Sequence, residues 1–187
     1  MTERRQLPLH PVSTGAAAAW IAMTAGSSVV LSLYFACVTP FVALSAVSAM
    51  ALPRQMAIYA VLLAWLGNQV VGYLILGYPQ AWDSYAWGLA IGVAAATSLL
   101  AAFVVIRLQT GIFAMAAGTF LAAFVVYEGV LFAATSVLPS GQGAFSIAVI
   151  SQVLVINAAA AAALALAHFL AAALRLLFVT ADAPMLR

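Results

Sequence analysis

Charge is the scarcest property of this sequence. Only 5% of the 187 residues are charged, lysine is absent, and all six basic residues are arginines. Hydrophobic residues make up 67% of the chain. Such a chain cannot hide its apolar surface from water by folding alone, so the bilayer must be the solvent for most of it. The net charge of only +2 and the lack of a basic patch interleaved with aromatic residues argue against a nucleic-acid partner.

Cysteine and histidine are nearly as scarce as charge. A single cysteine, Cys37, excludes an internal disulfide and a thiolate metal cluster. The two histidines are His10, near the N-terminus, and His168, which is predicted too far in depth from the acid Glu128 to share a metal with it. No nucleophile–histidine–acid set and no phosphate-binding glycine loop is found. We therefore expect no enzyme, no cofactor and no bound metal.

The sequence is rich in long apolar runs, and these predict its helices. The first run, from about 16 to 52, is too long for one crossing of roughly 20 residues and breaks best at Thr39-Pro40. The second of the two helices made by this break is short for a full crossing. An all-α polytopic membrane protein of one domain, 1–187, is predicted, with six transmembrane helices over about 16–37, 40–52, 54–77, 85–108, 112–137 and 144–176.

The arginines test this helix count. With six crossings and a cytoplasmic N-terminus, all of them fall on the cytoplasmic side, as the positive-inside rule requires. Asp83 then lies outside, and both termini are cytoplasmic. The arginines are Arg4, Arg5, Arg54, Arg107, Arg175 and Arg187.

The stretch from Trp65 to Trp87 concentrates hydrogen-bonding and stacking groups. It carries the amide pair Asn68 and Gln69 inside an apolar run, with Tyr73 on the same helical face as Gln69. Aromatic residues and Asp83 then surround a Gly-Tyr-Pro turn. The order of the helices predicts that this turn lies outside the membrane.

Other polar groups are expected at the same depth as the amides. Glu128, the one acid predicted inside a helix, lies about nine residues from its outer end, or roughly 14 Å down at 1.5 Å per residue. Such a carboxyl is costly unless it is protonated, paired or in contact with water. Gln152 lies at a similar depth in the last helix, and Asn157 lies deeper, as a pocket floor or a helix–helix bond.

This polar layer predicts a solute pocket open to the outside, in which amides and an acid supply hydrogen bonds and aromatic rings supply stacking. The alternative is that the same groups bond one another and hold helices together. The predicted ligand-binding residues are Asn68, Gln69, Tyr73, Trp82, Asp83, Trp87, Glu128, Gln152 and Asn157.

Small residues mark two close-packing faces. Ala18, Ala22 and Gly26 recur at every fourth position of the predicted first helix, and an alanine tract occupies Ala158–Ala163 in the last. Small side chains let membrane helices approach closely. Packing within the protein and docking of a partner are both compatible with these faces.

The architecture resembles that of the substrate-binding S-component of energy-coupling-factor vitamin transporters. It shares six helices in under 200 residues, cytoplasmic termini and an outer pocket, and Ala18 and Ala22 match the alanine-x-x-x-alanine spacing with which that family docks its coupling subunit. The resemblance implies capture of a vitamin-like solute or metal chelate. It also implies a transmembrane coupling subunit with ATPases as partner. The alanine-rich composition suggests a bacterial inner membrane.

Other functions are compatible with the same features. A non-catalytic structural or assembly subunit of a larger inner-membrane complex suits the small-residue faces and the short second helix equally well. A channel with Glu128 as a selectivity group would need an oligomer to form a ring of acids. An unaided carrier that exchanges a proton at Glu128 also remains open.

Overall fold

The computed structural model describes residues 15, 18, 19, 22, 26, 39–108, 111–141 and 143–173. The predicted helix over 16–37 and both tails lie mostly outside these residues. The elements within them are five helices: α2 (Phe41–Ala51), α3 (Arg54–Leu74), α4 (Trp82–Leu108), α5 (Ile112–Ala134) and α6 (Ile147–Ala173). Four of these, α3 to α6, are long and apolar enough to cross a membrane. The protein is therefore an all-helical membrane protein.

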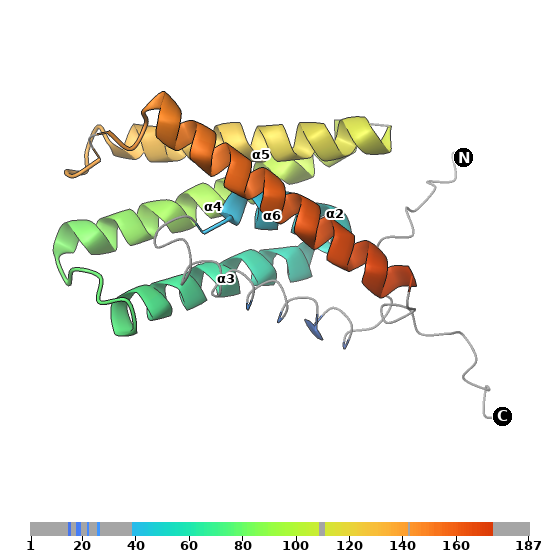
Figure 1. Cartoon of the computed structure of the whole chain (residues 1–187), viewed down its shortest axis with the longest axis horizontal. Helices are drawn as coiled ribbons and strands as arrows, with labels where there is room; N and C mark the ends of the chain where they lie inside the picture. The colour runs from blue at the N-terminus through green and yellow to red at the C-terminus, as the bar shows by residue number, and fades with distance from the viewer. Residues whose placement is uncertain are drawn as a thin grey trace.

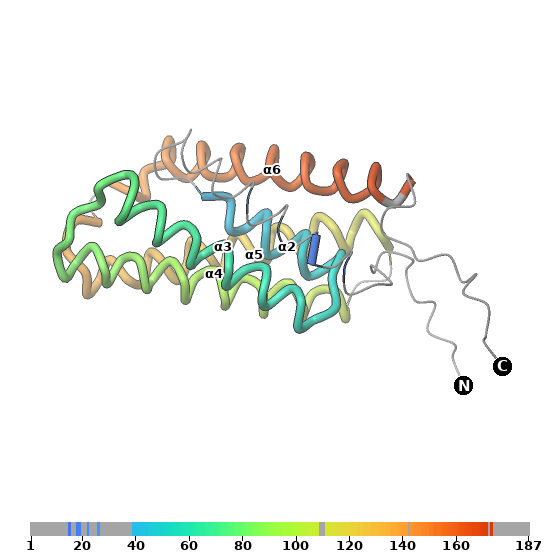
Figure 2. Tube along the Cα trace, turned by 90° about the horizontal axis from the view of Figure 1, so that it is seen from below, coloured from blue at the N-terminus to red at the C-terminus, as the bar shows by residue number. Residues whose placement is uncertain are grey.

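The helices form two layers with α2 between them. In Figure 1, α3, α4 and α5 lie beside one another and α6 crosses them obliquely. In Figure 2 the view is turned by 90°, and α6 lies on one side, α3, α4 and α5 on the other, and α2 in the middle. The short helix α2 packs against all four of the long ones. The bundle is thus built around its shortest element.

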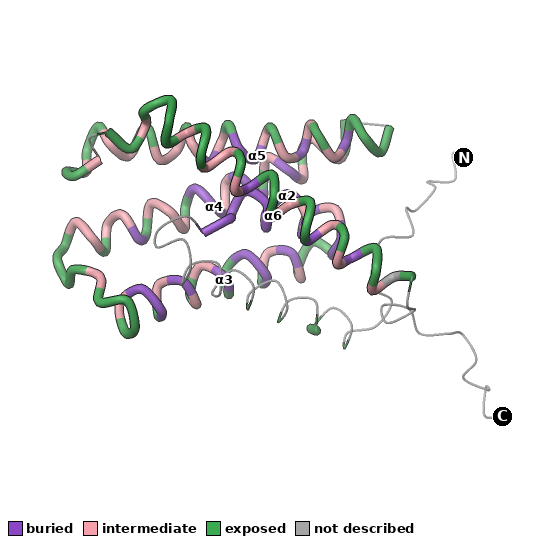
Figure 3. Tube along the Cα trace, viewed as in Figure 1, coloured by how far each residue is buried: buried purple, intermediate pink, exposed green. Residues whose placement is uncertain are grey.

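Nearly every residue of α2 is buried, which Figure 3 shows as the purple centre of the bundle. Its sequence, FVALSAVSAMA, is apolar or small on every face, and such a helix is stable only when surrounded by protein or lipid. Its 11 residues span about 16 Å, roughly half of a hydrocarbon core of about 30 Å. The helix begins near the middle of the bundle and ends at the start of α3 (Figure 2).

Polar contacts fix α2 within this apolar surrounding. The backbone N–H of Ala43, in the first turn, donates to Asn157 Oδ1 of α6 at 3.1 Å. Asn157 Nδ2 donates in turn to Val153 O at 3.0 Å, so that both ends of the amide are paired. On the α4 side, Ser45 Oγ lies 3.0 Å from Ser98 Oγ and donates to Ala95 O at 3.3 Å. Because lipid supplies no hydrogen bonds, a helix that starts at mid-membrane depth depends on such partners.

The charged residues of the long helices separate between the two ends of the bundle. Arg54, at the start of α3, lies over the ring of Phe103 near the end of α4, with 5.5 Å from its guanidinium carbon to the ring centroid. Arg107 lies in the last turn of α4, and Asp83 lies in the first turn, at the other end. We call these the arginine end and the loop end; the loop end holds the α3–α4 and α5–α6 connections.

The α3–α4 connection has the predicted length but lies three residues earlier in the chain, at 75–81 instead of 78–84. α3 ends at Leu74 instead of 77, because Gly77 adopts a left-handed conformation with φ of 69° and Tyr78 N–H turns back to donate to Gly72 O at 2.9 Å. α4 begins at Trp82 instead of 85. The carboxylate of Asp83 lies in the first turn, where it interacts favourably with the helix dipole.

The α5–α6 connection is longer than predicted. α5 ends at Ala134 instead of 137, where the hydroxyls of Thr135 and Ser136 donate to the carbonyls of Phe132 and Ala133, each at 2.6 Å. α6 begins at Ile147 instead of 144, and Ser146 Oγ accepts a bond from Val149 N–H at 3.4 Å as an N-cap. Glu128 therefore lies within two turns of the end of α5, closer to it than expected.

The bond between Asn157 and α2 should contribute to stability. We expect Asn157→Ala to lower the free energy of unfolding by about 1–3 kcal/mol, because the buried Ala43 N–H loses its acceptor. Thermal unfolding in detergent would measure the loss. Gln152→Ala on the same helix, at an exposed position, is the matched control and should change stability by less than about 0.5 kcal/mol. Equal effects of the two substitutions would contradict the role assigned to Asn157.

Candidate functional site

A polar cavity lies next to the N-terminus of α2, on the side that faces the loop end of the bundle. Its volume is about 170 Å³, and α3, α4, α5 and the segment that starts α2 contribute its walls. The lining groups are amides, hydroxyls and aromatic rings, and no charged side chain is among them in the part of the chain that the structure describes. The lining residues are Thr39, Phe41, Asn68, Gln69, Tyr73, Tyr78, Ser84, Trp87, Gly88, Ile91 and Tyr127.

The amide pair on α3 has two different roles. Asn68 is buried, and its Nδ2 donates to Thr39 Oγ1 at 2.6 Å, which joins α3 to the residue before Pro40 and α2. Gln69 Nε2 donates to Asn68 Oδ1 at 3.3 Å. Gln69 Oε1 accepts no hydrogen bond from any described residue. Asn68 therefore holds helices together, whereas Gln69 retains hydrogen-bonding capacity in the cavity.

Three tyrosines form an aromatic cluster at the loop end of the cavity. The Tyr73 ring stacks on Tyr85 with centroids 4.8 Å apart and meets Tyr78 edge-on at 5.9 Å. The Tyr73 hydroxyl lies 3.2 Å from Ser84 Oγ. Gly72 lets the Tyr78 ring lie directly against α3, because a Cβ at position 72 would overlap that ring. The cluster ties the α3–α4 connection to both helices.

Glycines of α4 let side chains of α3 reach the helix surface. Gly88 and Gly92 are one turn apart, a spacing typical of close helix contacts in membranes. The Trp65 Nε1–H donates to Gly88 O at 2.8 Å, and a Cβ on Gly92 would lie only 2.7 Å from the Trp65 ring. A Cβ on Gly88 would overlap Gln69 Oε1. Gly88 thus provides the space in which the Gln69 amide lies.

The wall formed by α5 is made by Tyr127. Its ring contacts Phe41 at the start of α2, with centroids 6.4 Å apart. Tyr127 is only 7% exposed, and its hydroxyl makes no hydrogen bond to any residue in the described ranges. Together with Gln69, it gives the cavity two polar groups whose hydrogen-bonding capacity the described residues do not fully use.

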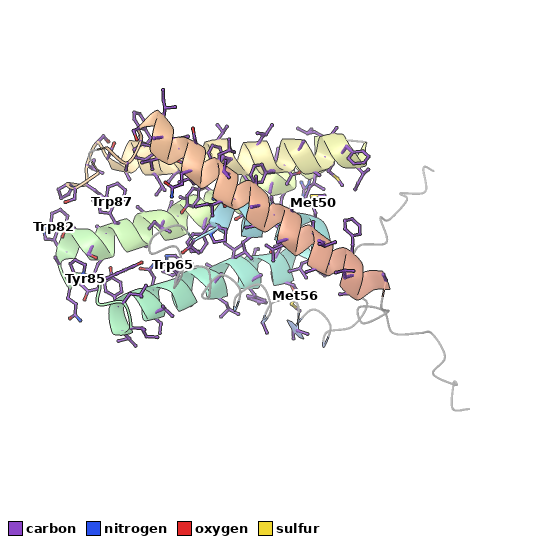
Figure 4. All side chains as sticks on the ribbon, in the orientation of Figure 1. Met50, Met56, Trp65, Trp82, Tyr85 and Trp87 are labelled. Carbon is purple, nitrogen blue, oxygen red and sulfur yellow. The ribbon has the colours of Figure 1, made fainter. Side chains whose placement is uncertain are left out.

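Four of the nine predicted ligand-binding residues line this cavity: Asn68, Gln69, Tyr73 and Trp87. Trp87 also donates its indole N–H to Pro139 O at 2.8 Å, which joins α4 to the α5–α6 connection. Figure 4 shows Trp82, Tyr85 and Trp87 gathered at the loop end of α4 and Trp65 further along the bundle.

The other five predicted residues do not line the cavity. Trp82 is 68% exposed, Asp83 is half-buried beside it, and Gln152 is exposed on α6. Asn157 bonds α2, so the helix–helix alternative describes it. Glu128 is half-buried but lies about 100° around α5 from Tyr127, the residue that faces the cavity. These residues were predicted from their depth along the helices, but their side chains do not face the same cavity.

The other lining residues were not among the predicted ligand-binding residues: Thr39, Phe41, Tyr78, Ser84, Gly88, Ile91 and Tyr127. On α4, the positions 84, 87, 88 and 91 recur at helical spacing and form one face. That pattern is visible in the sequence once the helix is known to start at Trp82. For Thr39 and Phe41 we find no comparable signal, because their place depends on how α2 packs.

The predicted docking residues are at the surface. Ala18, Ala22 and Gly26 are helical and exposed, as are the other described residues of this segment, Gly15 and Ala19. A Cβ added at Gly26 would meet no atom within 4 Å. A small-residue face is therefore accessible, although nothing in the described residues indicates what covers it.

A second, apolar cavity of about 440 Å³ lies between α2, α5 and α6, and the alanine tract contributes Ala158, Ala161 and Ala162 to its wall. His168 lies at its edge and is buried. Within the described residues, no three histidine, cysteine or acidic side chains come together in a way that could hold a metal ion. This cavity has almost no polar surface with which to orient a ligand.

Comparison of the chain with protein-family models, with curated proteins and with solved structures finds no match.

The contact between Trp65 and Gly92 gives a test of how α3 packs on α4. We expect Gly92→Ala to lower the free energy of unfolding by about 1–3 kcal/mol, because the new methyl group would displace the partly buried Trp65 indole. Thermal unfolding followed by tryptophan fluorescence would report the loss of stability and the changed surroundings of the indole. Gly129→Ala on α5, where nothing lies within 4 Å of the added Cβ, should be neutral or slightly stabilising. Equal loss in both variants would contradict this packing.

Proposed function

We propose that this protein binds a small solute within the membrane and serves in its uptake, with the polar cavity as the binding site. The observation that carries the proposal is the pair of uncommitted polar groups, Gln69 and Tyr127, on the wall of a cavity inside an apolar bundle. Polar groups at this depth are costly to keep unless something binds them. A concave site with a few converging polar groups and aromatic walls is the usual form of a small-molecule site.

The topology that suits this role has six helices and both termini in the cytoplasm, with the loop end outside. Arg54 and Arg107 then lie inside and Asp83 outside, in agreement with the positive-inside rule. In this topology α2 supplies only the inner half of the second crossing. The cavity then opens in the outer half of the membrane, where it would meet a solute before uptake.

The architecture that we propose is that of an S-component, which hands a vitamin-like solute to a coupling subunit driven by ATPases. The exposed Ala18, Ala22 and Gly26 would be the docking face for that subunit. A bacterial inner membrane is the proposed location. Catalysis plays no part in this role.

A structural or assembly subunit of a larger complex is the second candidate. It is favoured by the fact that Asn68 and Asn157 both use their amides in hydrogen bonds that join separate segments of the bundle. In that case, the exposed small-residue face would meet a permanent partner. The two candidates differ in whether a small molecule accompanies the purified protein.

Native mass spectrometry of gently extracted protein separates the two candidates. We expect a bound small molecule in the wild type and at least a tenfold lower occupancy in Gln69→Ala, which corresponds to about 1.4 kcal/mol. Gly88→Ala should act similarly, because its methyl group would displace the Gln69 amide. Gln152→Ala and Gly129→Ala are the controls and should keep the molecule. Protein subunits without a small molecule would support the structural role instead.

The proposed topology is tested by cysteine accessibility in intact cells. In a Cys37→Ala background, Gln80→Cys in the α3–α4 connection should react with a membrane-impermeant maleimide added outside. Leu108→Cys, at the exposed end of α4, should react only after the cells are opened. The reverse pattern would place the arginine end outside and overturn the proposed orientation.

A further inference from the structure

We infer that the solute is an uncharged molecule of about one ring that carries a carbonyl or similar acceptor next to an N–H donor, as in a cyclic amide or a ring carboxamide. This inference rests on the proposed solute-binding function and narrows it to a chemical class. Three properties of the cavity lead to it: a described lining without charge, the groups of Gln69 and Tyr127 that no described residue uses, and the size and aromatic character of the walls.

The described lining of the cavity offers no charged partner for an ion. Its described lining contains no acid and no base. Asp83 and Glu128 do not line it, and Arg54 and Arg107 lie at or near the arginine end. An anion held here without a counter-charge would lose its hydration for little compensating interaction. A cation would have only the faces of the aromatic rings as partners, with no carboxylate in the described lining to neutralise it. The described walls therefore favour an uncharged ligand.

Gln69 presents complementary groups on one side chain. One of its N–H groups is used by Asn68 Oδ1, and the other N–H and Oε1 have no partner within the described residues. A primary amide with a free donor and a free acceptor pairs best with a ligand edge that carries an acceptor and a donor side by side. A cyclic amide or a carboxamide has such an edge.

Tyr127 supplies a second point of recognition from another helix. Its hydroxyl can donate to a carbonyl or ring nitrogen or accept from an N–H. It lies on α5, whereas Gln69 lies on α3, so that a ligand bound to both would bridge two walls of the cavity. The hydroxyls of Tyr73 and Ser84 are bonded to each other and are less available.

Size and shape limit the ligand further. A volume of about 170 Å³ lies below the roughly 300–1,000 Å³ of typical drug-sized ligand pockets, which suits one substituted ring better than a large cofactor. The rings of Phe41, Tyr78 and Trp87 line the space. Aromatic walls favour a flat ligand because offset stacking adds to the burial of its faces.

The test uses matched probes on the full chain in lipid nanodiscs. Benzamide, benzoate and benzamidinium have nearly the same shape but are neutral, anionic and cationic, and 2-pyridone is a neutral cyclic amide. Binding would be measured by the change in tryptophan fluorescence, since Trp87 lines the cavity, and checked by calorimetry. We expect benzamide and 2-pyridone to bind at least tenfold more tightly than either charged probe.

Two variants test the residues that make the selection. Tyr127→Phe keeps the ring and removes the hydroxyl, and Gln69→Glu replaces the amide donor by a carboxylate; each should weaken binding of the neutral probes about tenfold. Gln152→Glu is the control, since position 152 does not line the cavity, and it should leave binding unchanged. The wild-type comparison of the four probes stands without any variant, should one of them fail to fold.

Each outcome decides the inference. Tighter binding of benzoate or benzamidinium than of benzamide would overturn it. Failure of both neutral probes, with a charged solute or one lacking such a donor–acceptor edge found on the protein by native mass spectrometry, would also overturn it and leave the proposed solute-binding function in place. Failure of all probes together with a protein that carries no small molecule would remove the proposed function itself.

Discussion

The hydrogen bond between Asn157 and the first turn of α2 is the interaction on which the bundle depends. A helix that begins at mid-membrane depth exposes backbone N–H groups where neither water nor lipid can accept them. Asn157 Oδ1 meets one of these groups from α6, and the same amide is satisfied by its own helix. Because this bond offsets the cost of an unpaired backbone N–H, a short helix can occupy the centre, and the four long helices pack on it.

The length of α2 determines where the cavity lies. Because α2 fills only the half of the bundle next to the arginine end, the long helices enclose free space beyond its N-terminus. Polar side chains from α3, α4 and α5 face that space. Gly88 and Gly92 have no side chains, so that Gln69 and Trp65 of α3 can pack directly against the backbone of α4. The short helix and the glycines together create a site that no single helix could form.

Apolar runs predicted the helices well and their ends less well, because short-range bonds such as those of Thr135 and Ser146 determine where a helix stops or starts. For the candidate site, the sequence indicated how deep each polar residue lies along its helix but not which side of the helix it faces. Glu128 and Tyr127 are at nearly the same depth, yet only Tyr127 faces inward. The spacing of four residues on α5 contains that information, since its buried face comprises Met115, Thr119, Ala123 and Tyr127.

Polar residues in a membrane helix either join helices or bind something else, and the structure separates these roles residue by residue. The amide of Asn157 is used on both sides within the protein, and Asn68 links α3 to Thr39. Gln69 is committed on one N–H only, and Tyr127 makes no bond within the described residues although it is buried. Helix cohesion explains the first two residues and leaves the second two without a reason. These two residues, both on the wall of a cavity whose described lining is uncharged, are the basis of the solute-binding proposal.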